Sequence, residues 1–258
     1  MQAALLITAI LVSATTDVSV VRIETTPKGF QLVRNGQPYL IKGAGGHSRM
    51  AELVTAGGNS VRTWHAENMG KCLDDAQDAG LTVTLGLWLG HERHGFRYDD
   101  PESVAAQRAQ VAEAVKKYKD HPALLMWGIG NEMEGDGRNP AVWKEVNVLA
   151  AMVKKEDPNH PVMTVIAGGG EKLGQFKKFC PDVDVLGINA YGDLSSLAAD
   201  LRKNNLSRPF VLTEFGPTGW WQVAKTSWEE EIEPTSSEKE QSYLAAYKAI
   251  VRGFPNEC

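Results

Sequence analysis

Two apolar segments of this chain each lead to a glutamate. Residues 124–132 end in Asn131-Glu132, and residues 210–216 contain Glu214. Apolar runs of this length are typical of strands buried on both faces in a parallel sheet. The carboxyl ends of such strands carry the active sites of barrel and open-sheet α/β enzymes. We therefore expect two carboxylates to meet across a barrel mouth, and such a pair can break a glycosidic bond.

The rest of the chain alternates between strand-like and helix-like patterns, which predicts a parallel βα sheet. Predicted strands cover residues 39–44, 59–64 and 82–89, one ending at Glu132, 162–167, 185–191, and one ending at Glu214. Predicted helices cover residues 48–56, 69–79, 101–119, 143–156, 173–179, 194–204 and 236–252.

The two ends of the chain depart from this repeat. Residues 20–24 and 29–33 alternate like half-buried strands, and Asn35-Gly36 follows as a tight turn, so an amino-terminal β-hairpin is expected. Residues 253–258 are too few for an eighth strand and helix. We therefore predict a (β/α)8 TIM barrel truncated after its seventh βα unit, with both sheet edges open. A fragment of a longer protein is the favoured explanation; closure by the amino-terminal apolar run is the alternative.

The two glutamate motifs carry a family resemblance. Gly130-Asn131-Glu132 and Thr213-Glu214-Phe215-Gly216 resemble the signatures of clan A glycoside hydrolases, above all the family 2 catalytic barrel and next family 5. The likeness extends over about residues 30–221. It implies a retaining enzyme without a cofactor, acting on a β-linked sugar, with Glu132 as acid/base and Glu214 as nucleophile. A retaining enzyme holds its carboxyl groups about 5–5.5 Å apart, whereas an inverting one leaves about 6.5–9.5 Å.

The same resemblance suggests roles for polar residues near these strand ends. Asn131 would hold the sugar 2-hydroxyl, although it could instead cap the next helix. Arg62 and Tyr191 resemble the residues that steady the nucleophile; a structural ion pair and a core tyrosine are the alternatives. Asn189 would line the same wall.

Further candidates come from loops and strand ends. His91 resembles a substrate-binding histidine of family 5. An equally good interpretation is that His91 is a loop histidine exposed to solvent. His47 and Trp64, at the ends of the first two strands, are expected to contact sugar. Trp220 and Trp221 are also substrate-binding candidates, because they would form a stacking wall for a neighbouring sugar; packing on the barrel rim is the alternative. His91 and His94 lack a nearby carboxylate cluster, so no metal site is predicted.

Composition limits the partners and the compartment. The net charge of −5 gives no broad basic field for nucleic acid. The apolar run of residues 3–14 is too short to cross a bilayer, but fits the apolar region of a signal peptide. We therefore expect a possible signal peptide in residues 1–19, a catalytic domain in residues 20–258, and export to the periplasm or the medium. The sequence does not indicate an oligomeric state.

Three functions remain open at this point. The first is a retaining β-glycosidase or glycanase that takes a carbohydrate substrate. The second is a non-catalytic carbohydrate-binding barrel or an inactive fragment, which the missing eighth strand favours. The third, a metal-dependent barrel hydrolase, requires a convergent histidine and aspartate set that the sequence does not present.

Overall fold

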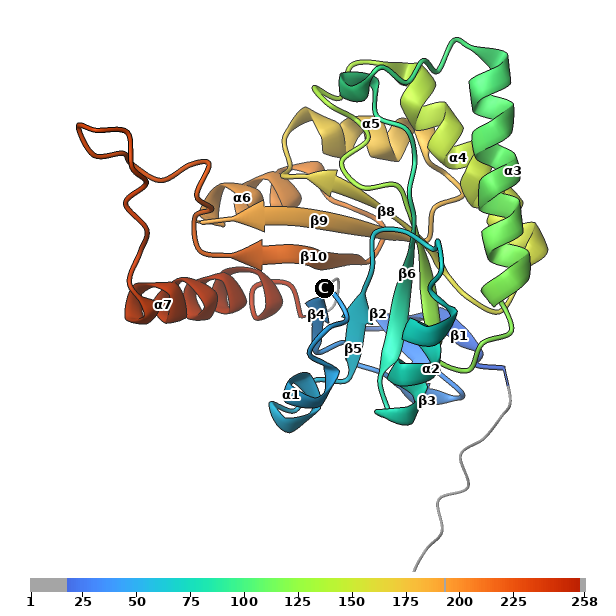
Figure 1. Ribbon diagram of the computed structural model, residues 1–258, viewed down its shortest axis with the longest axis horizontal. Helices are drawn as coiled ribbons and strands as arrows, with labels where there is room; N and C mark the ends of the chain where they lie inside the picture. The colour runs from blue at the N-terminus through green and yellow to red at the C-terminus, as the bar shows by residue number, and fades with distance from the viewer. Residues whose placement is uncertain (1–17, 193, 256–258) are drawn as a thin grey trace, which may run out of the picture.

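Seven parallel strands form the central sheet of the protein, in a computed structural model that describes residues 18–192 and 194–255. Their spatial order is β10-β9-β8-β7-β6-β5-β4, so each strand lies beside its predecessor in the chain, as in a TIM barrel (Figure 1). The predicted fold is therefore confirmed. The strands are β4 (Gly43–Gly45), β5 (Ser60–Arg62), β6 (Thr82–Leu87), β7 (Leu124–Ile129), β8 (Val162–Ala167), β9 (Val185–Tyr191) and β10 (Phe210–Gly216).

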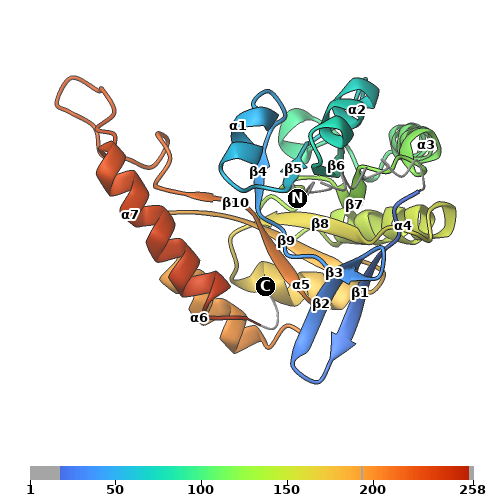
Figure 2. The same cartoon turned by 90° about the horizontal axis from the view of Figure 1, so that it is seen from below.

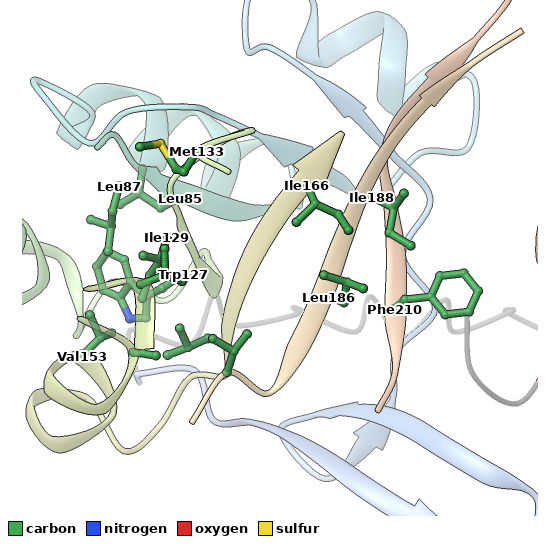
Figure 3. Close-up of a cluster of buried hydrophobic side chains, with 14 of the residues drawn as sticks. Leu85, Leu87, Trp127, Ile129, Met133, Val153, Ile166, Leu186, Ile188 and Phe210 are labelled. Atoms are coloured by element: carbon green, nitrogen blue, oxygen red, sulfur yellow. The ribbon is translucent and has the colours of Figure 1, made fainter. Parts of the chain in front are cut away.

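Helices between the strands cover the outer face of this sheet, and α3 and α4 lie side by side there (Figure 1). The main apolar core fills the space between the sheet and the helices, with Trp127 and Phe210 among its largest buried side chains (Figure 3). The helices are α1 (Met50–Thr55), α2 (Gly70–Asp78), α3 (Pro101–Tyr118), α4 (Pro140–Glu156), α5 (Glu171–Phe179), α6 (Ser195–Asn204) and α7 (Ser236–Ala246), with a 3-10 helix at Glu92–His94 and a π-helix at Tyr247–Val251.

The predicted amino-terminal hairpin is present as the antiparallel strands β1 (Val21–Thr26), β2 (Gly29–Arg34) and β3 (Gln37–Pro38) (Figure 2). Val21 packs with Met126 and Met163 in a second apolar cluster, separate from the main core. Because Met126 and Met163 also line the inside of the barrel, the hairpin closes the lower end of the barrel.

The sheet is open between β4 and β10, each of which has one sheet neighbour among the described residues. All three residues of β4 are exposed, as expected for a strand that lacks a partner on one side. Arg62 on β5 reaches across this opening, since its Nη1 atom donates to the carbonyl oxygen of Thr213 on β10 at 3.3 Å. A side-chain bond from β5, rather than a strand ladder, therefore reaches β10 across the opening.

Some element boundaries differ from prediction. The first barrel strand was expected to begin at Tyr39, but Tyr39 donates its backbone N–H to Leu32 and its hydroxyl to the carbonyl of Asn59, which holds this segment beside the hairpin. The strand expected to reach Glu132 ends at Ile129, because Gly130 has φ of 67° and turns the chain out of the sheet. The last helix was expected to reach Arg252, but its α-helical part ends at Ala246.

Residues 1–17 lie outside the described residues, and with them most of the predicted signal peptide. Ser19 is fully buried, and its hydroxyl contacts the carbonyl oxygen of Leu124 and Nε2 of His160. Within the described part of the chain, no helix is both long and apolar enough to span a membrane.

A buried polar network lies at the lower end of β7. Asp157 accepts hydrogen bonds from Trp127 Nε1 at 2.7 Å and from His160 Nδ1 at 2.8 Å, and His160 Nε2 contacts Ser19 Oγ at 2.9 Å. These hydrogen bonds link a serine, a histidine and an aspartate in the same sequence as in a catalytic triad. However, the side chains of Ser19, His160 and Asp157 are all buried and cannot reach a substrate. The network is therefore structural, and joins the start of the described chain to the barrel.

Replacing Asp157 by Ala is expected to lower the free energy of unfolding by about 3 kcal/mol, because two buried donors lose their acceptor. Burial by itself raises the pKa of Asp157, but the hydrogen bond and charge of His160 outweigh this and leave the pKa below its usual value. The stabilisation of the folded state by the Asp157 carboxylate is therefore fully present above about pH 4, the pKa of an unfolded aspartate. It is lost as the pH falls through the lowered pKa of the folded state. Urea unfolding of the parent protein and of Asp157→Ala at pH 7 and pH 3 measures this effect. An equal difference in the free energy of unfolding at the two pH values would contradict the prediction.

Candidate functional site

Glu214 projects from β10 next to an irregularity in the strand. The pairing of β10 with β9 passes from Leu212–Ile188 directly to Glu214–Asn189, so Thr213 is the extra residue of a β-bulge. The hydroxyl of Thr213 donates to Oδ1 of Asn189 at 2.8 Å, which fixes the bulge to the neighbouring strand. Bulges commonly redirect a side chain beside an active site. This one sets the position at which Glu214 leaves the strand.

Three donors from two other strand ends converge on the Glu214 carboxylate. Arg62 Nη1 and Trp64 Nε1, at the end of β5, donate to Oε1 at 2.9 and 2.8 Å, and the hydroxyl of Tyr191 on β9 donates to Oε2 at 2.7 Å. The arginine also forms an ion pair with Glu214 and stacks over the ring of Trp64. The carboxylate is thus held in one orientation.

The same donors control its charge. Burial raises the pKa of Glu214, but the hydrogen bonds from Trp64, Tyr191 and Arg62 and the arginine charge outweigh burial and hold the pKa below its ordinary value. Burial, together with the bond to Glu214, raises the pKa of Tyr191, so its hydroxyl keeps its proton and remains a donor. Glu214 is therefore ionised at neutral pH.

Glu132 sits on a strained turn after β7. Its φ is 52°, a conformation that non-glycine residues rarely adopt and that costs on the order of 1–3 kcal/mol. Its backbone N–H donates to the carbonyl of Val165 on β8, and its Oε1 accepts from Nδ2 of Asn189 at 2.9 Å. Strain of this kind often accompanies a functional position.

Asn131 connects the two glutamates. Its Oδ1 accepts from Nη2 of Arg62 at 2.7 Å and from Nδ2 of Asn189 at 3.2 Å. Arg62 in turn holds Glu214, and Asn189 holds Glu132. Because both donors approach the oxygen of Asn131, its Nδ2 group is left to donate elsewhere.

A cavity of about 390 Å³ lies inside the barrel beside this network, within the usual range of small-molecule sites. It extends from Arg62, Tyr191 and Glu214 down to Met126 and Met163. Arg62 and Glu214 are the only charged side chains among the described residues that line it, and they are paired with each other.

The remaining predicted residues are Trp220, Trp221, His47 and His91. Trp221 meets Tyr191 edge-to-face with ring centroids 5.3 Å apart, and Trp220 meets Trp221 at 6.0 Å; both indoles are exposed. His47 is exposed. His91 is 3 % exposed, so the reading of a solvated loop histidine is wrong. It lines a second hollow, away from the cavity that holds Glu214.

No cluster of three or more potential metal ligands occurs among residues 18–192 and 194–255. Two side chains that shape the site were not singled out from the sequence. Thr213 lies inside the second glutamate motif, which was the available signal for it. Tyr243 lines the cavity from α7 and packs edge-to-face on Phe215, and no sequence pattern distinguishes it from the other tyrosines.

Comparison with known proteins agrees with this geometry. Residues 48–220 match the profile described as "Glycosyl hydrolases family 2, TIM barrel domain". A β-galactosidase of Vibrio vulnificus is 26% identical over 232 residues, covering 74% of this chain and 21% of its own length. A putative β-glucuronidase of Formosa agariphila is also 26% identical, over 203 residues, with 74% and 17% covered. The chain thus spans about a fifth of the length of these curated relatives.

Solved structures show the same fold. A β-D-glucuronidase of Dictyoglomus thermophilum superposes with a TM-score of 0.68 at 22% identity, covering 91% of this chain and 45% of that one. A β-galacturonidase of Eisenbergiella tayi bound to galacturonate superposes with a TM-score of 0.66 at 20% identity, covering 90% and 44%.

Proposed function

The chain belongs to family 2 of the glycosyl hydrolases, through their TIM barrel domain, and on this basis we propose that it is a retaining β-glycosidase. Glu214 is the nucleophile and Glu132 the acid/base. The observation that carries the proposal is the convergence of Arg62, Trp64 and Tyr191 on Glu214. A nucleophile must be ionised and fixed in direction, and these three donors provide both conditions.

The reaction follows from this arrangement in two steps. The Glu214 carboxylate attacks the anomeric carbon, the bond to the leaving oxygen breaks, and that oxygen takes the proton of Glu132. Glu132, now ionised, removes a proton from water, which attacks the anomeric carbon and releases Glu214. The sugar keeps its β configuration because the configuration at the anomeric carbon is inverted twice.

Asn131 is the residue proposed to hold the sugar 2-hydroxyl. Its Oδ1 is occupied by Arg62 and Asn189, so its Nδ2 is the group available to donate. A hydrogen bond to this hydroxyl strengthens in the transition state, where the ring flattens toward an oxocarbenium ion. Trp221 is proposed to stack on a sugar ring, and its edge-to-face contact with Tyr191 supports this role.

The charges of the cavity favour a neutral sugar over a uronic acid. A uronate carboxylate requires a cation or several donors, and the one cation among the described lining residues already pairs with Glu214. β-Galactosides, β-glucosides and β-mannosides are therefore the proposed substrates.

Labelling with 2-deoxy-2-fluoro β-glycosides tests the function. The galacto, gluco, manno and glucuronic compounds are each incubated with the protein, followed by intact-mass spectrometry and peptide mapping. We expect a slowly released label on Glu214 from a neutral sugar, and no label on Glu214→Gln. A folded protein that takes no label and releases no sugar would support the carbohydrate-binding alternative. Turnover with inversion, followed by ¹H NMR, would overturn the retaining mechanism.

Replacing Tyr191 by Phe is expected to shift the acid limb of the kcat/KM profile to higher pH. The variant loses one of the donors that hold the pKa of Glu214 down, so the carboxylate protonates at a higher pH. A hydrogen bond to a charged group contributes about 1.5 kcal/mol and one pKa unit corresponds to about 1.4 kcal/mol, so the shift should be about one pH unit. Tyr247→Phe, on the far part of the last helix, is the control and should leave the profile unchanged. An unshifted acid limb in Tyr191→Phe would show that Glu214 does not set it.

A further inference from the structure

The strand β9 presents a polar inner face toward the catalytic site. Leu186 and Ile188 point outward and are buried in the core between sheet and helices (Figure 3). Side chains alternate along a strand, so Gly187, Asn189 and Tyr191 share the opposite, inward face. The hydroxyl of Tyr191 holds the proposed nucleophile. Asn189 occupies the preceding inward position and is 3 % exposed, so its polar atoms need partners within the protein.

The amide of Asn189 contacts three side chains. Its Nδ2 group donates to Oε1 of Glu132 at 2.9 Å and to Oδ1 of Asn131 at 3.2 Å, and its Oδ1 accepts from the hydroxyl of Thr213 at 2.8 Å. An amide nitrogen carries two hydrogens, so both donors of Asn189 are engaged with protein atoms. Asn189 therefore has no N–H left to donate to a sugar hydroxyl.

Arg62 determines which way these amides are turned. A guanidinium group can only donate hydrogen bonds, and Nη2 of Arg62 lies 2.7 Å from Oδ1 of Asn131. The oxygen of Asn131 therefore faces the network, and Asn189 must turn its Nδ2 group toward this oxygen because two amide oxygens repel each other. Oδ1 of Asn189 is then left on the other side, where only a donor can satisfy it. The hydroxyl of Thr213 is that donor.

Thr213 is held closely against β9. It is the extra residue of the β-bulge that precedes Glu214, and it lines the central cavity. Its methyl group packs on Gly187, since a Cβ atom added to this glycine would lie 2.9 Å from Cγ2 of Thr213. Without the Thr213 hydroxyl, Oδ1 of Asn189 would lose its partner among the described residues, and an unpaired buried acceptor is costly. The methyl group of Thr213 thus packs the bulge against β9, and its hydroxyl holds Asn189.

This arrangement limits where Glu132 can carry its proton. A general acid must hold a proton on one of its two carboxyl oxygens. The N–H of Asn189 points at Oε1 of Glu132, so a proton on Oε1 would meet it hydrogen to hydrogen. Oε2 accepts no hydrogen bond from the residues that the structure describes, and a proton there is free to move to a leaving oxygen. Asn189 thereby distinguishes two carboxyl oxygens that are equivalent in solution.

We propose that Thr213 is a positioning residue that acts through Asn189, and that Asn189 confines the acid proton of Glu132 to Oε2. The inference rests on the proposed glycosidase function and deepens it, because it names the residues that direct proton transfer to the leaving group. Neither residue bonds to the carboxylate of Glu214, which keeps its three donors when they are replaced. Their loss should therefore slow only substrates whose leaving oxygen must be protonated.

The test compares two β-glycosides of the sugar that labels the parent protein, one with an alkyl and one with a dinitrophenyl leaving group. Thr213→Val keeps the shape of the side chain and removes its hydroxyl. We expect kcat/KM to fall about tenfold for the alkyl glycoside and to stay within about twofold of the parent value for the dinitrophenyl glycoside, because a dinitrophenolate departs without a proton. Thr213→Ser removes the methyl group but keeps the hydroxyl, so it should retain most of the activity toward the alkyl glycoside. A role in packing alone would give the reverse order.

Asn189→Ala is the second variant, because it removes the group through which Thr213 is proposed to act. It should show the same selective loss for the alkyl glycoside, at least as large as that of Thr213→Val. In the double variant the Thr213→Val change should add nothing further, since residues in one hydrogen-bond network are not additive. Losses that multiply in the double variant would show that Thr213 acts independently of Asn189, and would overturn the inference.

Thr82→Val is the matched control. Thr82 is buried at the first position of β6, at the end of the barrel opposite to the two glutamates, and its hydroxyl donates to Oγ of Ser60 at 2.9 Å. This variant should leave the ratio of the two kcat/KM values unchanged, and circular dichroism should show every variant folded. An unchanged ratio in Thr213→Val would overturn the inference, while hydrolysis by the parent protein and its fluoroglycoside label on Glu214 stand. A parent protein that neither hydrolyses these glycosides nor takes the label would overturn the proposed function, and this inference with it.

Discussion

Replacement of Glu214 by Ala is expected to lower kcat for aryl β-glycosides by about 10⁴-fold or more, because the chemical step loses its nucleophile. The loss should appear in kcat rather than KM, since attack on the anomeric carbon occurs only in the transition state. The measurement is steady-state hydrolysis of a nitrophenyl glycoside of the sugar that labels the parent protein.

Sodium azide provides the test specific to this role. In Glu214→Ala an azide ion can occupy the space of the missing carboxylate and attack the same face of the sugar. The C–O bond to the leaving group breaks, a C–N bond forms, and Glu132 protonates the leaving oxygen. The product is then an α-glycosyl azide, identified by the ¹H coupling of its anomeric proton. A variant that regains no activity with azide, or that gives the β-azide, would contradict the assignment.

The variant also has a structural consequence. Arg62 is 8 % exposed, and removal of Glu214 leaves it with Asn131 and the Thr213 carbonyl as its remaining partners. An uncompensated buried charge is destabilising, so circular dichroism and urea unfolding must accompany the kinetics. Glu214→Gln keeps the shape of the side chain and should be inactive with a smaller loss of stability, which separates chemistry from folding.

Replacement of Glu132 by Ala is expected to have an effect that depends on the leaving group. For a poor leaving group, such as an alkyl alcohol, kcat/KM should fall by about 10²–10⁴-fold, the usual contribution of a general acid. A dinitrophenolate needs no proton to depart, so its first step should be almost unaffected. The second step lacks its general base, and the glycosyl-enzyme should accumulate as a burst of dinitrophenol.

The measurement is a series of aryl glycosides whose leaving-group pKa varies, with log(kcat/KM) plotted against that pKa. We expect a steep dependence in Glu132→Ala and a shallow one in the parent protein. Azide should here give the β-glycosyl azide, since it attacks the intermediate on Glu214. The matched control is Glu134→Gln, because Glu134 belongs to the same turn but binds Lys172 and the Ala167 N–H. Equal losses for all leaving groups in Glu132→Ala would show that Glu132 is not the acid.

The sequence alone was sufficient for the order of the elements, and it singled out the two glutamates as candidates. Strands such as Val162–Ala167 and Val185–Tyr191 have the predicted bounds because apolar β-branched runs between turn residues are local signals. These glutamates became candidates because each follows or ends such a run, and the ends of parallel strands meet at one end of a barrel. The seven strands of the open sheet in the described part of the chain were also predicted, since this required only counting repeats.

Tertiary structure decided what surrounds those carboxylates. Trp64 was expected to contact sugar, yet its indole N–H donates to Glu214, a contact made across the open edge of the barrel by residues 150 positions apart. His91 looked like a loop residue, because its burial depends on Trp88 and on the folding back of Phe96 over Gly90. The left-handed backbone of Glu132 is likewise set by its bond to β8 rather than by its residue type. Residue type and periodicity act over a few positions, whereas charge, burial and hydrogen-bond partners depend on which distant strands the barrel brings together.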